Sequence, residues 1–198
     1  MAVRIVPSAD VSDDAVIGDG TSVWHLAQVR EQVVMGEGCV VGRGAYIGTG
    51  VQMGDHCKVQ NYALVYEPAV LGNGVFIGPA VVLTNDTYPR AINPDGSLKS
   101  ADDWHAVGVT IGEGAAIGAR AVCVAPLTVG AWATVAAGSV VTRDVPAHAI
   151  VMGVPARQVG WVGRAGVPLQ ERDGRLVCPQ TGTVYEEFEG SIREVASK

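Results

Sequence analysis

The sequence predicts an all-β fold, in which short strands stack along a solenoid that is interrupted by one loop and followed by a C-terminal appendage. Three observations support this prediction. An apolar side chain recurs at every sixth residue, the recurrence stops once and then resumes, and glycine is abundant (26) whereas aromatic residues make up only 6%. The recurring positions are Ile5, Val11, Ile17, Val23, Val29, Met35, Val41, Ile47, Met53, Val59, Val65, Leu71, Ile77 and Leu83, then Ile111, Ile117, Cys123, Val129, Val135 and Val141.

A period of six is neither the helical period of about 3.6 nor simple strand alternation. It is met by short strands separated by turns, because six is a multiple of the two-residue repeat of a strand. Most of the recurring residues are followed, four positions later, by a small or β-branched residue such as Ala27, Cys57 or Ala63. One large and one small inward side chain per six residues would form one flat side of a narrow core.

These six-residue units resemble those of the hexapeptide-repeat acyltransferases, over about residues 5–157. The resemblance implies a left-handed parallel β-helix in which three units close a triangular turn of chain, which we call a rung. The period alone would not select this hand, because it reverses the usual crossover rule. In such a helix, residues 18 positions apart lie above one another, about 5 Å apart. Glu31, Thr49, Glu67 and Asn85 then share one outward edge.

The repeat is interrupted over about residues 85–105, a segment that contains Pro89, Pro94 and Gly96. A long excursion from a compact repeat protein is more often functional than accidental. It leaves from the edge that carries Asn85, which makes this edge the first candidate for a functional site.

We divide the chain into a β-helix domain, 1–157, and a C-terminal segment, 158–198, that combines a cap with a β-hairpin. The sequence PQTG, residues 179–182, predicts the turn of this hairpin. The last residues, from Ser191 onward, are expected to form a short helical or frayed tail.

Composition excludes several classes of function. A formal net charge of −6 argues against nonspecific nucleic-acid binding. No apolar run approaches the roughly 20 residues that span a bilayer, and the start has no signal-peptide core, so a cytoplasmic protein is expected. His25, His56, His105 and His148 fall at no ligand-like interval, and no metal centre is expected.

The segment 140–160, VVTRDVPAHAIVMGVPARQVG, resembles the end of coenzyme A-dependent hexapeptide acyltransferases. This resemblance implies an acetyl-CoA channel between neighbouring subunits of a homotrimer. Backbone amides of IGAR (117–120) and VAAGSVV (135–141) would contact the pantetheine, and arginines would bind the phosphates. The implied cofactor residues are Ala119, Arg120, Ala137, Arg143, Pro155 and Arg157.

The N-terminal half narrows the implied substrate. VWH (23–25), KVQNYALVYE (58–67) and LTNDTYPRA (83–91) resemble the nucleotide-linked 3-amino-sugar N-acetyltransferases, with either UDP or dTDP as the nucleotide. The resemblance places Asn85 at the reacting amine, as the catalytic residue. The other implied substrate-binding residues are His25, Glu31, Asn61, Tyr66, Glu67, Tyr88 and Arg90.

The chemistry leaves the proton acceptor open. An amine attacks a thioester only when it is unprotonated, and the intermediate carries an oxyanion. Asn85 can orient the amine or stabilise this intermediate, but it cannot act as a base. The resemblance implies direct attack in a ternary complex, in which the departing thiolate can accept the proton. The candidates for a protein base are His25, His105, Glu31, Glu67 and Asp86.

Three other functions are compatible with this type of fold. A xenobiotic or antibiotic acetyltransferase would use a loop histidine, and His105 stands at the very end of the interruption. A γ-type carbonic anhydrase would need three converging histidines. An ice-binding solenoid would need a regular outward ladder, for example of threonines. The irregular outward positions argue against the last of these.

Overall fold

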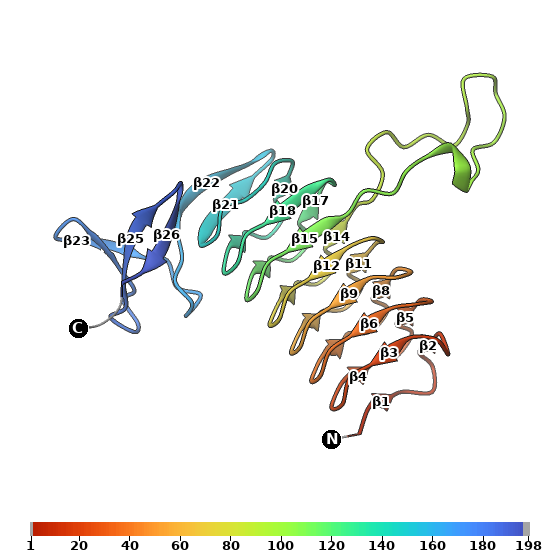
Figure 1. Ribbon diagram of the computed structural model, residues 1–198, viewed down its shortest axis with the longest axis horizontal. Helices are drawn as coiled ribbons and strands as arrows, with labels where there is room; N and C mark the ends of the chain where they lie inside the picture. Colours follow the sequence, from red (N-terminus) through yellow and green to blue (C-terminus); the bar gives the residue numbers. More distant parts are fainter. Residues whose placement is uncertain (1, 196–198) are drawn as a thin grey trace.

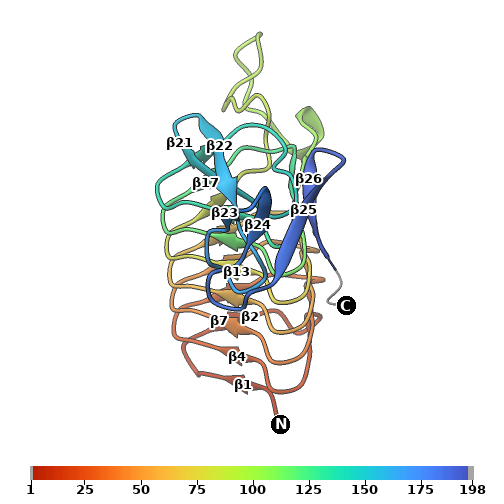
Figure 2. The same ribbon diagram turned by 90° about the vertical axis from the view of Figure 1, so that its left-hand side faces the viewer.

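The computed structural model describes residues 2–195 and shows a left-handed parallel β-helix, as predicted (Figures 1 and 2). Sheet A contains β1 (Arg4–Ile5), β4 (Ser22–Val23), β7 (Val40–Val41), β10 (Lys58–Val59), β13 (Phe76–Ile77), β16 (Ala116–Ile117), β19 (Thr134–Val135), β21 (Ala149–Gly153) and β22 (Ala156–Trp161). Sheet B contains β2 (Asp10–Val11), β5 (Gln28–Val29), β8 (Tyr46–Ile47), β11 (Leu64–Val65), β14 (Val82–Leu83), β17 (Val122–Cys123) and β20 (Val140–Val141). Sheet C contains β3 (Val16–Ile17), β6 (Val34–Met35), β9 (Gln52–Met53), β12 (Val70–Leu71), β15 (Val109–Ile111) and β18 (Leu127–Val129).

The register between rungs follows the predicted stacking. Leu64 pairs with Tyr46 on one side and with Val82 on the other, all in parallel strands. After the interruption, Leu71 pairs with Ile111, so the inserted residues are left out of the ladder. The repeat therefore resumes in the rung where it stopped.

The core is formed by the recurring apolar positions. Ile47, Ile77 and Ile117 are completely buried, and small residues such as Ala63 fill the space beside them. At the N-terminal end, Ile5 is 46% exposed because no earlier rung covers it.

Each rung turns at three corners. We call the turn between sheets A and B corner 1, the turn between B and C corner 2, and the turn between C and A corner 3. At corner 3, Gly114 has a φ of 65°, and a Cβ on it would collide with the ring of Trp132 from the following rung. The missing side chain therefore allows the indole to pack closely against the turn below.

The inserted loop leaves corner 2 after Asn85 and returns at Val107, whose N–H donates to the Asn85 carbonyl at 3.0 Å. Between these residues it projects away from the β-helix (Figure 1). It contains one short 3₁₀-helix, η1 (Ala101–Asp103), which Ser100 caps. Tyr88 and Leu98 are 80% and 78% exposed.

The C-terminal segment forms a four-stranded antiparallel sheet, β23 (Gln170–Arg172), β24 (Arg175–Val177), β25 (Val184–Phe188) and β26 (Ser191–Glu194). The predicted hairpin is confirmed, because β24 pairs with β25 around the PQTG turn. The predicted helical or frayed tail is wrong for β26, whose alternating apolar Ile192 packs beside Tyr185. Residues 196–198, also assigned to that tail, lie outside the described residues.

This C-terminal sheet docks on corner 3, on the side of the β-helix opposite to the loop (Figure 1). The Ser191 hydroxyl donates to the Ala147 carbonyl at 2.7 Å. The rings of His148 and Tyr185 lie 5.6 Å apart, and His148 Nδ1 lies 2.9 Å from the Val162 carbonyl. Within residues 2–195, no helix is long and apolar enough to cross a membrane.

This docking is expected to weaken at acidic pH. Burial lowers the pKa of His148 below its ordinary value of 6.5; Arg164 lowers it further, while the Val162 carbonyl and Glu194 oppose the shift. Because its pKa is lower in the folded chain, His148 binds a proton more readily when the protein unfolds. Its contribution to the free energy of unfolding is therefore fully present above pH 6.5 and is lost as the pH falls below that value. We expect the thermal midpoint to fall on acidification, and to fall less in His148→Asn. The control is His56→Asn, at an exposed position of the same corner, which should keep the wild-type pH profile. Identical profiles for all three proteins would contradict the role of His148 in this pH dependence.

Candidate functional site

Most of the predicted site residues lie at two corners that flank sheet B. Glu31, Tyr66, Glu67 and Asn85 lie at corner 2, where the loop begins. His25, Asn61, Ala119, Arg120 and Ala137 lie at corner 1. One chain alone therefore does not bring the two groups together, because the width of sheet B separates them.

The corner 2 stack has the predicted order. The Thr49 hydroxyl donates to Glu31 Oε2 at 3.3 Å, one rung apart. Arg30 forms an ion pair with Glu31 at 3.0 Å. Glu67 follows Thr49, and Asn85 follows Glu67 at the next rung.

Glu67 carries the most unusual polar atom of this corner. Its Oε2 is buried and has no hydrogen-bond partner, and it is the one such side-chain atom within residues 2–195. A Cβ at Gly48 would collide with this oxygen, so the glycine makes the space in which the carboxylate is folded back. A buried carboxylate oxygen without a donor is costly, which makes Glu67 a candidate site residue.

Tyr46, in strand β8 of sheet B, lies next to this corner, although no sequence motif singles it out. Its ring centroid lies 5.2 Å from that of Tyr66. Burial, followed by the nearby charge of Glu67, raises the pKa of Tyr46 above its ordinary value. The residue occupies an outward strand position, where polar and aromatic side chains are common, so only the register reveals that it stands beside Tyr66 and Glu67.

Asn85 holds the neck of the loop through its backbone, which leaves its side chain available. Its carboxamide makes no hydrogen bond within the part of the chain that the structure describes. The neighbouring Asp86 carboxylate accepts the Tyr88 N–H at 2.8 Å and shapes the start of the loop.

Tyr88 and Arg90 lie on the projecting loop rather than at the corner 2 stack. The Arg90 guanidinium donates to the Pro89 carbonyl at 2.9 Å. Together with Lys99 and Trp104 it lines a loop hollow of about 460 Å³.

At corner 1, the N-terminal rungs differ from the C-terminal ones. His25 Nδ1 lies 2.8 Å from the Ser8 hydroxyl. The Asn61 side chain accepts the Arg43 N–H at 2.9 Å, one rung below it. In later rungs the equivalent positions are Ala119 and Ala137, and among residues 2–195 no hydrogen-bond acceptor is found for the N–H of either. The N–H groups of His25 and Asn61 also have no acceptor within these residues, so backbone amides are open in both the early and the late rungs of this corner.

The remaining predicted cofactor residues lie near the C-terminal end of the β-helix. Arg143 and Arg157 line one hollow of about 170 Å³. Pro155 is at the tip of the β21–β22 hairpin, beside Val154, which is 72% exposed. Arg120 is exposed at corner 1 and does not line this hollow.

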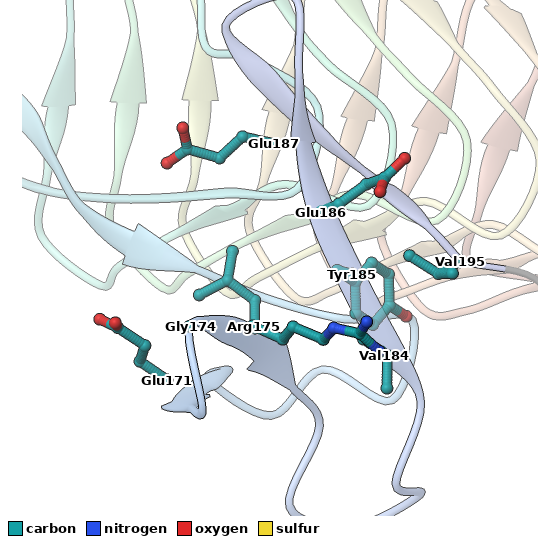
Figure 3. Close-up of a pocket in the computed structure, with 9 residues that line it drawn as sticks. Glu171, Gly174, Arg175, Val184, Tyr185, Glu186, Glu187 and Val195 are labelled. Carbon is teal, nitrogen blue, oxygen red and sulfur yellow. The ribbon is translucent and has the colours of Figure 1, made fainter.

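A separate hollow of about 530 Å³ lies on the C-terminal sheet (Figure 3). Glu171, Arg175, Glu186 and Glu187 surround it, and Glu186 is already paired with Arg193 at 2.7 Å. None of the predicted site residues lines this hollow. Across the described residues, no group of three or more His, Cys, Asp or Glu side chains is arranged to hold a metal ion.

Comparison with known proteins agrees with a β-helix built from six-residue repeats. Residues 14–49 match the bacterial transferase hexapeptide (six repeats), and residues 108–143 match the hexapeptide repeat of succinyl-transferase. The bifunctional protein GlmU of Xanthomonas campestris is 32% identical over 162 residues, which are 81% of this chain and 28% of that protein. The dTDP-3-amino-3,6-dideoxy-alpha-D-galactopyranose 3-N-acetyltransferase of Aneurinibacillus thermoaerophilus is 42% identical over 83 residues, 42% of this chain and 43% of that enzyme.

Among solved structures, a mutant of perosamine N-acetyltransferase from Caulobacter crescentus, in complex with CoA and GDP-perosamine, has a TM-score of 0.50. It is 23% identical and covers 81% of this chain and 57% of that chain, a level that shows the fold. The chain thus spans less than half the length of the two curated relatives.

The matched repeats and the rung geometry together show that the chain is a left-handed β-helix built from hexapeptide repeats. Its 42% identity over 83 residues to a dTDP-3-amino-sugar N-acetyltransferase agrees with the resemblance seen in the sequence.

Proposed function

We propose that the protein is an acetyl-CoA-dependent N-acetyltransferase that acetylates the 3-amino group of a UDP- or dTDP-linked amino sugar. The observation that carries this proposal is the corner 2 stack, where the unpaired Glu67 carboxylate lies one rung below Asn85 at the neck of the loop. A hydrogen-bond acceptor for the N–H of the unprotonated amine and a neutral amide that can orient this amine are groups that suit amine acylation.

The two residues have different roles in this proposal. Glu67 accepts a hydrogen bond from the amine and holds it at the corner. Asn85 orients the amine toward the thioester or stabilises the tetrahedral oxyanion. Attack is direct, within a ternary complex, and the departing thiolate can take the amine proton. Tyr46 and Tyr66 form an aromatic wall beside the sugar.

Acetyl-CoA would bind along corner 1 toward the C-terminal end. The open amides of Ala119 and Ala137 suit pantetheine, which is itself a chain of amides. Arg143, at corner 2 of the last rung, and Arg157 share one hollow at the C-terminal end and supply cations for the phosphates, and Arg120 adds a third at corner 1.

The two corners would meet in a homotrimer. Outward side chains of sheet B from Tyr46 onward are uncharged and half-buried, namely Tyr46, Leu64, Val82, Val122 and Val140. A threefold assembly through these faces would bring corner 1 of one protomer to corner 2 of its neighbour. A fully active monomer would contradict this placement.

Thiol release from acetyl-CoA tests the proposed function. We expect release with a panel of UDP- and dTDP-linked 3-amino sugars, and none with the corresponding 3-hydroxy sugars, which are the matched controls. Release with chloramphenicol or a streptogramin, and not with the amino sugars, would instead indicate the xenobiotic acetyltransferase.

A further inference from the structure

We infer that a hollow beside Trp24 at corner 1 binds the nucleoside diphosphate of the substrate. The hollow has a volume of about 260 Å³ and is lined by Trp24, His25, Val40, Gly42, Arg43, Gln60 and Asn61. This inference rests on the proposed function and adds to it the place of the nucleotide.

The hollow has a flat aromatic wall that is held in place. The Arg4 guanidinium, which belongs to the preceding rung, lies 4.7 Å from the Trp24 ring. Val40 and Gly42, in the following rung, line the hollow. A Cβ on Gly42 would collide with the backbone and side chain of Asn61, so the glycine lets Asn61 of the next rung pack closely against it at the hollow. A planar base can stack on the indole in this hollow, and stacking on an aromatic ring suits any base.

The rim supplies hydrogen-bonding groups and positive charge. Gln60 and Asn61 carry carboxamides, which both donate and accept hydrogen bonds, as the edge of a nucleobase requires. Arg43 is exposed on the rim, and Lys58 stands beside Val40 in the next strand. No carboxylate lines the hollow among the described residues, although the chain has a net charge of −6. This local excess of cations favours an anion such as a diphosphate.

The position of the hollow along the β-helix axis, relative to Asn85, suits a nucleotide sugar. Asn61, Arg43 and Trp24 lie one, two and three rungs before the rung of Asn85. At about 4.8 Å per rung, they are about 5–14 Å from it along the axis. Ala119 and Ala137 lie on the other side of that rung. The nucleotide would thus approach Asn85 from the N-terminal side, and acetyl-CoA from the C-terminal side.

Calorimetric titration without acetyl-CoA tests the inference, with UDP, dTDP, GDP and inorganic pyrophosphate as probes. We expect at least one nucleoside diphosphate to bind more tightly than pyrophosphate. In Trp24→Leu its Kd should rise about tenfold or more, as loss of one stacking partner predicts. Val40→Phe, which fills the hollow and leaves Trp24 in place, should raise the Kd similarly.

Trp104→Leu is the control, because Trp104 lines the loop hollow instead. Unchanged affinity in both Trp24→Leu and Val40→Phe would overturn the inference, as would a loss confined to Trp104→Leu or equal binding of pyrophosphate. Circular dichroism of each variant verifies that the β-helix is intact.

The same variants separate this inference from the proposed function. If thiol release with an amino-sugar nucleotide persists and its KM is unchanged in Trp24→Leu, only the place of the nucleotide is wrong. If the wild-type protein releases no thiol with any member of the panel, the proposed function itself fails, whatever the nucleotide affinities are.

Discussion

Replacement of Asn85 by alanine is expected to lower kcat by about a hundredfold or more, the loss that follows removal of one group aimed at an oxyanion. The Asn85 carboxamide makes no hydrogen bond within the described chain, and the neck of the loop is held by its backbone carbonyl. The substitution therefore removes the carboxamide that would orient the amine or stabilise the oxyanion, and it keeps the hydrogen bond from Val107. Single-turnover rates of thiol release measure the effect, because they separate chemistry from product release.

Asn93→Ala is the matched control, since Asn93 lies within the same loop and bonds to Ser97. It should retain most of the wild-type kcat. Gel filtration of both variants should give the wild-type elution volume. If Asn85→Ala kept nearly full activity, the reacting amine would have to lie elsewhere, and the role assigned to corner 2 would be wrong.

Replacement of Leu71 by alanine is expected to lower the free energy of unfolding by about 2–5 kcal/mol, the range for large-to-small changes in a packed core. Leu71 is 2% exposed and pairs with Met53 below and Ile111 above. Ile111 belongs to the first strand after the loop, so a cavity here would loosen the contact that restores the repeat. Urea unfolding at a fixed protein concentration measures the change, because an oligomer is stabilised by mass action.

Val70→Ala provides the control from the adjacent position of the same strand. Val70 points outward and is 40% exposed, so its truncation should change the stability by about 0.5 kcal/mol. If the two variants lost equal stability, the alternation of inward and outward residues would not describe this strand.

The sequence predicted those features that depend on position within the six-residue unit. Inward burial of residues such as Ile77, the contact between Glu31 and Thr49, and the resumption of the ladder at Ile111 all follow from the pleat and from the rung length. These features are fixed by local geometry, which a period expresses directly.

The features that the sequence did not predict depend on contacts that do not recur with the six-residue period. The burial of Glu67 Oε2 arises from the missing side chain of Gly48 one rung away, and the pairing of Tyr46 with Tyr66 requires the register of two rungs. The strand β26 forms because Ile192 is covered by a separate small core at corner 3. Such tertiary contacts override the weak local preference that favoured a helix or frayed end.

The bond between Val107 and Asn85 has a consequence for how the protein can vary. Because the excursion begins and ends at a single hydrogen bond, its length is independent of the ladder beneath it. Insertions or deletions in residues 86–106 would alter the segment that covers corner 2. They would do so at little cost, because the entropic cost of closing a loop grows slowly with its length. Under the proposed function, a different acyl acceptor could thus be bound through changes in this one surface loop, without any change in the β-helix.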